Sequence, residues 1–140
     1  MTDHPVLMHT VIDALECRPL ADFYRELLGL QWRSGDEPPT DGSPDDVDWL
    51  VLVDDAGRRV LAFQDVPSIK RPDWPDHEVP AQMHLDLRVP DVAALERQRW
   101  RAEELGARLL HDRTDDPDEP LYVLADPAGH PFCLLVAPGS

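Results

Sequence analysis

The segment that decides the fold reads LYVLADPAG, residues 121–129, and it has an earlier counterpart in WLVLVDDAG, residues 49–57. Each copy is an apolar run that ends in an acidic turn with a glycine, and each turn leads into a second apolar run. Two apolar runs around such a turn predict a β-hairpin, here over 49–65 and over 120–137. A hairpin that occurs twice in this way indicates two copies of one supersecondary unit.

The sequence before each hairpin also repeats in the same order. A predicted strand that contains a histidine, His9 or His84, leads into a predicted helix and then into a short strand. Gly29 suits the C-terminal cap of the first helix, and Asp91 suits the N-cap of the second. The predicted strands span 6–13, 30–33, 82–89 and 107–111, and the predicted helices span 19–29 and 91–105. The fold class is therefore α+β, with two tandem βαβββ modules.

A chain of 140 residues is expected to form a single domain made of these two modules. The first module spans 1–66, a proline-rich linker spans 67–80, and the second module spans 81–140. Their strands are predicted to form a curved mixed sheet around a cleft, with the helices on the outer face. The acidic, proline-containing loop over 34–48 is expected to be flexible and to set specificity together with loop 112–119.

The charge of the chain limits the ligands it can bind. The net charge of −15 argues against nucleic acid, because a phosphate backbone requires clustered Lys and Arg side chains. The charge either keeps a small protein soluble or attracts a cationic ligand. The longest apolar runs have the length of strands, so no membrane-spanning segment is expected.

The N-terminal sequence and the cysteines favour a cytoplasmic protein. Residues 1–5 lack the basic and apolar regions of a secretory signal. Cys17 and Cys133 are then expected to be reduced thiols rather than partners in a disulfide.

Four segments of the chain resemble the vicinal oxygen chelate superfamily, which includes glyoxalases, bleomycin-resistance proteins and ring-cleaving dioxygenases. They are His9-Thr10, FYRELLG at residues 23–29, HLDLRV at 84–89, and DPAGHPF at 126–132. Four such segments in order, laid over an internal duplication, extend the resemblance across almost the whole chain. The resemblance implies a homodimer and a divalent metal in the cleft, with ligands from the first and last strand of each module.

Carried over to this chain, the pattern of the superfamily places His9 and His84 at two ligand positions. Cys133 stands where metal-dependent members have Glu, four residues after the turn glycine, and Leu61 stands at the same count in the first half. Gln64 lies three residues beyond Leu61, so it faces the cleft only if a β-bulge interrupts the strand. The predicted metal set is therefore His9, His84 and Cys133, with Gln64 as a fourth ligand, for Zn²⁺, Ni²⁺, Mn²⁺ or Fe²⁺.

A polar stripe along the predicted strand 82–89 indicates the ligand-binding face. His84, Asp86 and Arg88 alternate with apolar residues, so one face of this strand is polar and the other is dry. Asp86 either replaces the missing carboxylate ligand or forms an ion pair with Arg88. The residues predicted to line the cleft are His9, Val11, Trp49, Leu61, Phe63, His84, Asp86, Arg88 and Cys133.

Several of these residues also have an ordinary structural explanation. Cys133 lies in an apolar strand, where cysteine most often behaves as a small buried hydrophobe. Trp49 and Trp74 either belong to the core and its rim or stack on a flat ligand.

Two classes of function follow. The first, which the missing carboxylates favour, is a protein that binds a small molecule in the cleft without a catalytic metal or another cofactor. The second is a metal-dependent isomerase, lyase or ring-cleaving dioxygenase that uses His9 and His84 as ligands. Isomerases of this fold use a glutamate as the base that moves a proton, and neither carboxylate position holds one in this chain.

Overall fold

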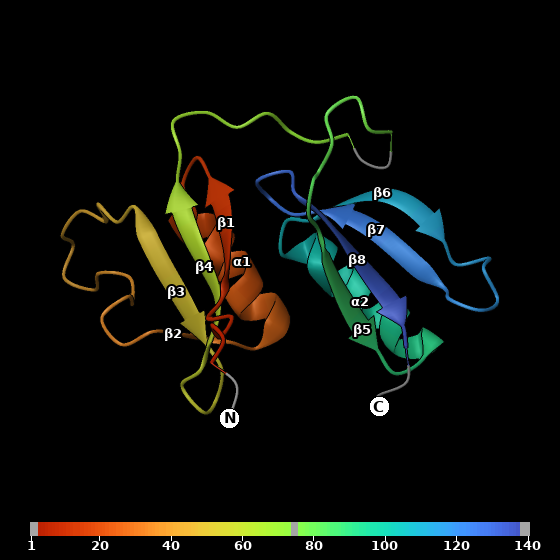
Figure 1. The fold of residues 1–140 in the computed structure, drawn as a ribbon, viewed down its shortest axis with the longest axis horizontal. Helices are drawn as coiled ribbons and strands as arrows, with labels where there is room; N and C mark the ends of the chain where they lie inside the picture. The colour runs from red at the N-terminus through yellow and green to blue at the C-terminus, as the bar shows by residue number, and fades with distance from the viewer. Residues whose placement is uncertain (1–2, 74–75, 138–140) are drawn as a thin grey trace. The chain divides into compact units, whose positions relative to one another are not determined.

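The computed structural model describes residues 3–73 and 76–137, and its ribbon is drawn in Figure 1. The chain divides into two units, Met1–Ile69 and Lys70–Ser140. The first unit contains β1 (Thr10–Ala14), α1 (Cys17–Leu28), β2 (Gln31–Trp32), β3 (Trp49–Val53) and β4 (Arg59–Asp65). The second unit contains β5 (Leu85–Val89), α2 (Val92–Glu104), β6 (Arg108–Arg113), β7 (Leu121–Ala125) and β8 (Pro131–Val136). The predicted stacking residue Trp74 lies outside the described residues.

Each unit carries its own four-stranded mixed sheet. The strand order is β1-β4-β3-β2 in the first sheet and β5-β8-β7-β6 in the second. The first strand of each unit pairs in parallel with the last, and the remaining neighbours pair antiparallel. The prediction of an α+β fold built from two βαβββ modules is confirmed. The eight strands form two four-stranded sheets, one in each unit.

The hairpin strands of the first unit begin and end as predicted, whereas the first strand of each unit is shorter than predicted. β1 begins at Thr10 and β5 begins at Leu85, so both histidines stand directly before a strand rather than inside it. In the second unit the chain turns just before β5. Gln82 adopts a left-handed conformation with φ 63°, and the Met83 N–H donates to the Ala81 carbonyl. A left-handed residue cannot continue an extended strand, so pairing starts only after it.

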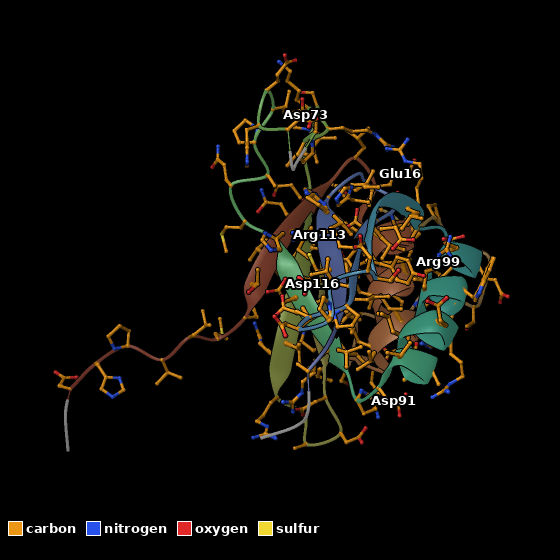
Figure 2. The ribbon with its side chains drawn as sticks, turned by 90° about the vertical axis from the view of Figure 1, so that its right-hand side faces the viewer. Glu16, Asp73, Asp91, Arg99, Arg113 and Asp116 are labelled. Carbon is orange, nitrogen blue, oxygen red and sulfur yellow. The ribbon has the colours of Figure 1, made fainter. Side chains whose placement is uncertain are left out.

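The two helices begin with different caps. Asp91 precedes α2, as Figure 2 shows, and its carboxylate accepts a hydrogen bond from the Ala94 N–H at 2.8 Å. This confirms the predicted N-cap. Glu16 precedes α1 without a side-chain cap bond among the described residues. At its other end α1 stops at Gly29, whose φ of 67° is the left-handed conformation predicted for a C-terminal glycine.

Each helix packs on one face of its own sheet. In the first unit the ring of Tyr24 from α1 stacks on Phe63 from β4, with 5.9 Å between ring centroids. In the second unit the Tyr122 hydroxyl from β7 donates to the Glu96 carboxylate of α2 at 2.6 Å. Because side chains alternate along a strand, these two contacts fix which residues of each sheet face the helix. Among the described residues, neither helix reaches the length and apolarity that crossing a bilayer requires.

The acidic loop that follows β2 is anchored, contrary to the expectation that it is flexible. Arg18 of α1 donates to the Asp45 carboxylate at 2.8 Å and to the Asp36 carbonyl at 2.5 Å. The Asp36 side chain accepts from the Val51 N–H of β3 at 2.9 Å, and the Cys17 thiol lies 3.7 Å from the Val47 carbonyl. The Asp45 and Asp36 carboxylates of this loop therefore serve as hydrogen-bond partners for α1 and β3, respectively.

Candidate functional site

The register of the second sheet places Asp86 and Cys133 side by side. Asp86 of β5 pairs with Cys133 of β8, and Cys133 pairs with Val123 of β7. Tyr122, one residue before Val123, faces α2. Because neighbouring side chains point to opposite faces, Cys133 and Asp86 belong to the face opposite the helix.

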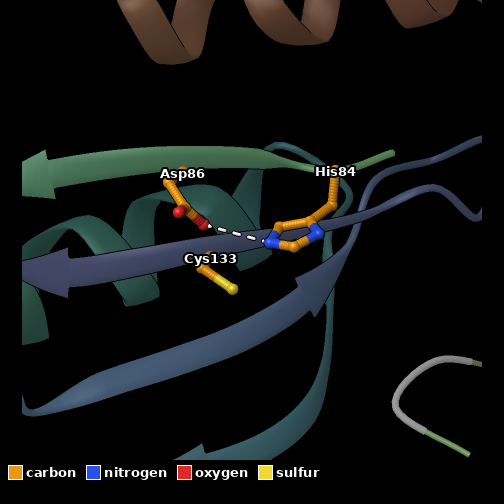
Figure 3. Close-up of side chains that lie close together, drawn as sticks. All are labelled: His84, Asp86 and Cys133. Atoms are coloured by element: carbon orange, nitrogen blue, oxygen red, sulfur yellow. Dashed lines mark ion pairs between the residues drawn. The ribbon is translucent and has the colours of Figure 1, made fainter. Parts of the chain in front are cut away.

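His84 completes a cluster with these two side chains, as Figure 3 shows. Its Nε2 lies 3.3 Å from the Asp86 Oδ1, and the side chains of His84 and Asp86 are 33% and 62% exposed. The imidazole nitrogen, the carboxylate oxygen and the Cys133 sulfur all lie within 4.8 Å of one another. Of the two predicted roles for Asp86, a substitute carboxylate ligand or an ion pair with Arg88, the contact with His84 fits the first.

Cys133 is buried on one side by apolar residues. It packs with Leu121 and Val123, and the partly buried Leu110 and Leu135 adjoin this cluster. Burial, and to a smaller extent the Asp86 carboxylate beside it, raises the pKa of the Cys133 thiol to about 12. The thiol is therefore protonated at neutral pH when no cation is bound. It is not a nucleophile in that state, because nucleophilic attack needs the thiolate.

Two charged residues near Cys133 were not predicted from the sequence. The Glu119 carboxylate also raises the pKa of the Cys133 thiol, and the Arg113 guanidinium lowers it. Arg113 ends β6 and Glu119 lies in the loop before β7. The sequence of loop 112–119 has no distinguishing pattern. Its position directly before the hairpin is the one feature that could have indicated that its side chains lie near Cys133.

In the first unit His9 stands at the position that corresponds to His84. Its ring lies 5.9 Å from the ring of Trp49, tilted by 54°, and its Nδ1 is buried without a hydrogen-bond partner among the described residues. Burial lowers the pKa of His9 below 6.5, and the Arg59 and Arg33 guanidinium groups lower it further. His9 is thus neutral at pH 7 and packs against an aromatic ring.

A β-bulge in the first hairpin changes the predicted equivalence between the two halves. Leu52 pairs with Leu61, but the next residue, Val53, pairs with Arg59, so Val60 is an extra residue in β4. The second hairpin pairs without a shift from Leu121 opposite Leu135 to Ala125 opposite Pro131. The residue that corresponds to Cys133 is therefore Ala62, not Leu61.

This register corrects the predicted ligand-facing residues of the first unit. Phe63 stacks on Tyr24 of α1, and Leu61, two residues before it, shares that face, so neither lies on the face opposite the helix. Gln64, Val11 and Trp49 share the opposite face, because Gln64 pairs with Trp49 and Val11 pairs with Ala62. The bulge lies at Val60, before Leu61, so Gln64 is on this face while Leu61 is on the other.

The residues predicted to bind metal are thus distributed over both units. His84 and Cys133 lie together, with Asp86 as the nearest further ligand. His9 and Gln64 belong to the first unit, and the metal set that joins them to His84 and Cys133 stays a prediction, as does the cleft between the modules. Arg88 is exposed and follows Asp86 on the polar face of β5.

Comparison with known proteins gives matches over most of the chain. A family model described as a glyoxalase-like domain matches residues 9–135. No curated protein matches the chain. A glyoxalase/bleomycin resistance protein/dioxygenase family enzyme from Burkholderia phytofirmans PsJN has a similar structure, with a TM-score of 0.62, 16% identity, and coverage of 92% of this chain and 96% of that one.

Two further structures carry names that indicate an activity. The fosfomycin resistance protein FosX of Listeria monocytogenes has a TM-score of 0.66 and 11% identity, over 96% of this chain and 95% of that one. A lactoylglutathione lyase from Agrobacterium tumefaciens has a TM-score of 0.58 and 18% identity, over 97% and 96%. At these identities the likeness shows the fold and leaves the chemistry to the site residues.

Proposed function

Because the chain belongs to the glyoxalase-like domain family, we propose that it binds a small molecule on the polar face of β5 and β8. The observation that carries this proposal is the His84–Asp86–Cys133 cluster with Arg88 beyond it on the same strand. The opposite face of these strands packs against α2, so this is the face on which the second unit offers polar groups to a ligand. Polar groups that converge beside an apolar surface are typical of small-molecule sites.

We propose that this binding does not rely on a catalytic metal. Metal-dependent members of the superfamily use a glutamate on the last strand of a module, and this chain has Cys133 and Ala62 at the two corresponding positions. Alanine has no proton-transferring group, and the Cys133 thiol, with a pKa of about 12, holds its proton at neutral pH. A general base must accept a proton near the operating pH, and neither residue does so.

The remaining expectations complete the proposal. We propose a homodimer in the cytoplasm that does not bind nucleic acid. The buried, unpaired thiols of Cys17 and Cys133 support a reducing compartment. The net charge of −15 supports a ligand with a cationic group over an anionic one.

A thermal-shift screen in the presence of a chelator tests the proposal. Flat cationic molecules are screened first, and a ligand at 100-fold its dissociation constant stabilises the protein by about 2.7 kcal/mol, which for a chain of this length is a shift on the order of 8 °C. Asp86→Asn should weaken the response, because it removes a negative charge from the face that would bind the cation. Asp115→Asn, an exposed aspartate in the loop before β7, is the matched control and should leave it unchanged. Equal shifts in all variants would place the ligand elsewhere.

A metal-dependent isomerase, lyase or dioxygenase is the second candidate function. The observation in its favour is that His84, Asp86 and Cys133 bring an imidazole, a carboxylate and a thiol together, a donor set that fits a divalent cation. A metal bound there would act as a Lewis acid toward a substrate oxygen. His84 and Asp86 would hold it, and Arg88 would orient an anionic substrate group. Turnover of lactoylglutathione-type substrates that depends on added metal would favour this candidate over the first.

A further inference from the structure

We propose that His84, Asp86 and Cys133 form a binding site for a thiophilic divalent cation of the Zn²⁺ class, built wholly within the second unit. The superfamily pattern draws its ligands from both modules and uses glutamate. In the site proposed here all three protein ligands lie in the second unit: Cys133 on β8, Asp86 on β5 and His84 directly before β5. A thiolate and an aspartate take the place of the glutamate. It goes beyond the proposed small-molecule function and does not depend on it.

The distance between two of the ligand atoms already suits a tetrahedral ion. The His84 Nε2 and the Asp86 Oδ1 are 3.3 Å apart. Two ligands bound to Zn²⁺ at about 2.0–2.2 Å in a tetrahedron are separated by about 3.3–3.5 Å. An ion can therefore enter between the imidazole and the carboxylate with little movement of either group.

The third ligand atom, the Cys133 sulfur, lies within 4.8 Å of both others. A thiolate and an imidazole on Zn²⁺ stand about 3.5 Å apart, so the sulfur would need to move by no more than roughly 1 Å to bind the same ion. Figure 3 shows the side chain of Cys133 close to those of Asp86 and His84. The Cys133 proton leaves to solvent as the S–metal bond forms, and a water molecule occupies the fourth position.

The surrounding charges and the donor atoms decide which cation is held. The Asp86 and Glu119 carboxylates both act on Cys133, and Arg113 opposes them, so two negative charges and one positive charge surround the thiol. Thiolate and imidazole ligands select Zn²⁺ and similar ions over Mg²⁺, Ca²⁺ and Mn²⁺. The exposure of His84 and Asp86 gives the ion a path from solvent.

Titration of the full chain with Co²⁺ under reducing conditions tests the proposal directly. Co²⁺ replaces Zn²⁺ in tetrahedral sites, and a cobalt–thiolate bond gives a charge-transfer band in the near ultraviolet that histidine and carboxylate ligands alone do not give. We expect this band at one equivalent, its loss on addition of Zn²⁺, and no competition from Mg²⁺. Absence of the band in the wild-type protein overturns the proposal.

Matched variants assign the ligands. Cys133→Ala should abolish the band, whereas Cys17→Ala, which removes the buried thiol of the first unit, should keep it. Asp86→Asn should weaken Co²⁺ binding at least about tenfold, since loss of even an outer partner of a metal ligand costs 10–100-fold. Asp115→Asn is its control. Because the Asp86 side chain is exposed, this variant tests the site even if Cys133→Ala disturbs the fold.

His9→Phe distinguishes a site within one unit from a site that draws on both. Phenylalanine keeps an aromatic ring against Trp49 and removes the ring nitrogens. An unchanged band supports the proposal, and loss of the band shows that His9 is a ligand and overturns it. The ligand screen with chelator present is read separately. If a small molecule binds in the presence of chelator, the proposed function is supported whatever the cobalt result. If the cobalt band appears but no small molecule binds, only the metal site is supported.

Discussion

The two units share one backbone plan and differ on the sheet face that turns away from the helix. In the second unit Asp86 and Cys133 pair across β5 and β8, and the His84 Nε2 lies 3.3 Å from the Asp86 carboxylate. At the same register in the first unit Val11 pairs with Ala62, and His9 faces Trp49. On the helix side both sheets bury large apolar side chains, such as Phe63 in the first unit and Leu134 in the second. The two modules therefore share the apolar side chains that pack against the helix, while the side chains on the face opposite the helix differ between them.

The largest expected effect comes from the helix side, where the units should behave alike. Phe63 and Leu134 occupy the same place in the two sheets and are fully or almost fully buried. Phe63→Ala should lower the free energy of unfolding by about 3–5 kcal/mol and Leu134→Ala by about 2–5 kcal/mol. Urea denaturation followed by circular dichroism measures both. A loss below about 1 kcal/mol in one unit would mean that its helix is not packed on the sheet as described.

The second effect concerns the single buried thiol of each unit. The pKa of Cys17 and the pKa of Cys133 are both raised to about 12 from 9.0, chiefly by burial. Each folded thiol stays protonated while the unfolded thiol ionises, so its contribution to stability is complete below pH 9 and is lost as the pH rises toward 12. The loss is at most about 1.4 kcal/mol per pH unit per thiol.

Urea denaturation between pH 8 and pH 11 measures this loss. The alkaline decline should be shallower in Cys17→Ala and in Cys133→Ala than in the wild-type protein, and shallowest in the double variant. A decline that is identical in all four proteins would show that these thiols are not the buried groups that titrate.

The third effect separates the units by their helix caps. Asp91→Ala removes the hydrogen bond to the Ala94 N–H and should cost about 1 kcal/mol, while Glu16→Ala should change stability by less than about 0.5 kcal/mol. The two variants are compared by thermal melting at pH 7. Asp91→Asn is the control, because asparagine also caps a helix, and it should recover most of the loss. Equal costs at both positions would contradict the difference between the caps.

The smallest expected effect is a decrease in the free energy of unfolding at acid pH, caused by His9 in the first unit. Its pKa is lowered from 6.5, first by burial and then by Arg59 and Arg33. The folded protein therefore resists protonation more than the unfolded chain does, and this part of the stability is present above pH 6.5 and is lost as the pH falls through the lowered pKa. Stability profiles from pH 8 to pH 5 should fall less steeply in His9→Phe than in the wild-type protein, and parallel profiles would contradict the burial of His9.

The backbone plan was predictable from the sequence because its signals are local. Each of these signals acts within a few positions of the chain: the apolar runs, the acidic turns with glycine, Gly29 and the cap residue Asp91. Because the same order of elements occurs in both halves, each half supported the prediction for the other. The site was less predictable. Alternation along the strand predicted that His84 and Asp86 share a face, whereas the pairing of Asp86 with Cys133 comes from the register of β5 with β8.

The remainder of the site depended on interactions that a single sequence does not reveal. The extra residue at Val60 cannot be recognised from the sequence, because the turns of the two hairpins are alike. Counting residues from Gly57 therefore placed Leu61 and Phe63 on the face opposite the helix. The influence of Glu119 and Arg113 on Cys133 comes from a loop that carries no periodic pattern. The anchoring of loop 34–48 by Arg18 joins residues far apart in the chain, and its composition alone favoured flexibility.

The extra residue in β4 also governs how the two halves can be aligned or exchanged. A superposition of the halves by sequence needs a one-residue gap opposite Val60, and without it every later position of the first half is matched to the wrong face. Library designs that transfer side chains from the second half to the first should therefore pair Cys133 with Ala62 and Leu135 with Gln64. A design made without the gap would place polar groups beneath α1, where they would unfold the unit instead of changing what it binds.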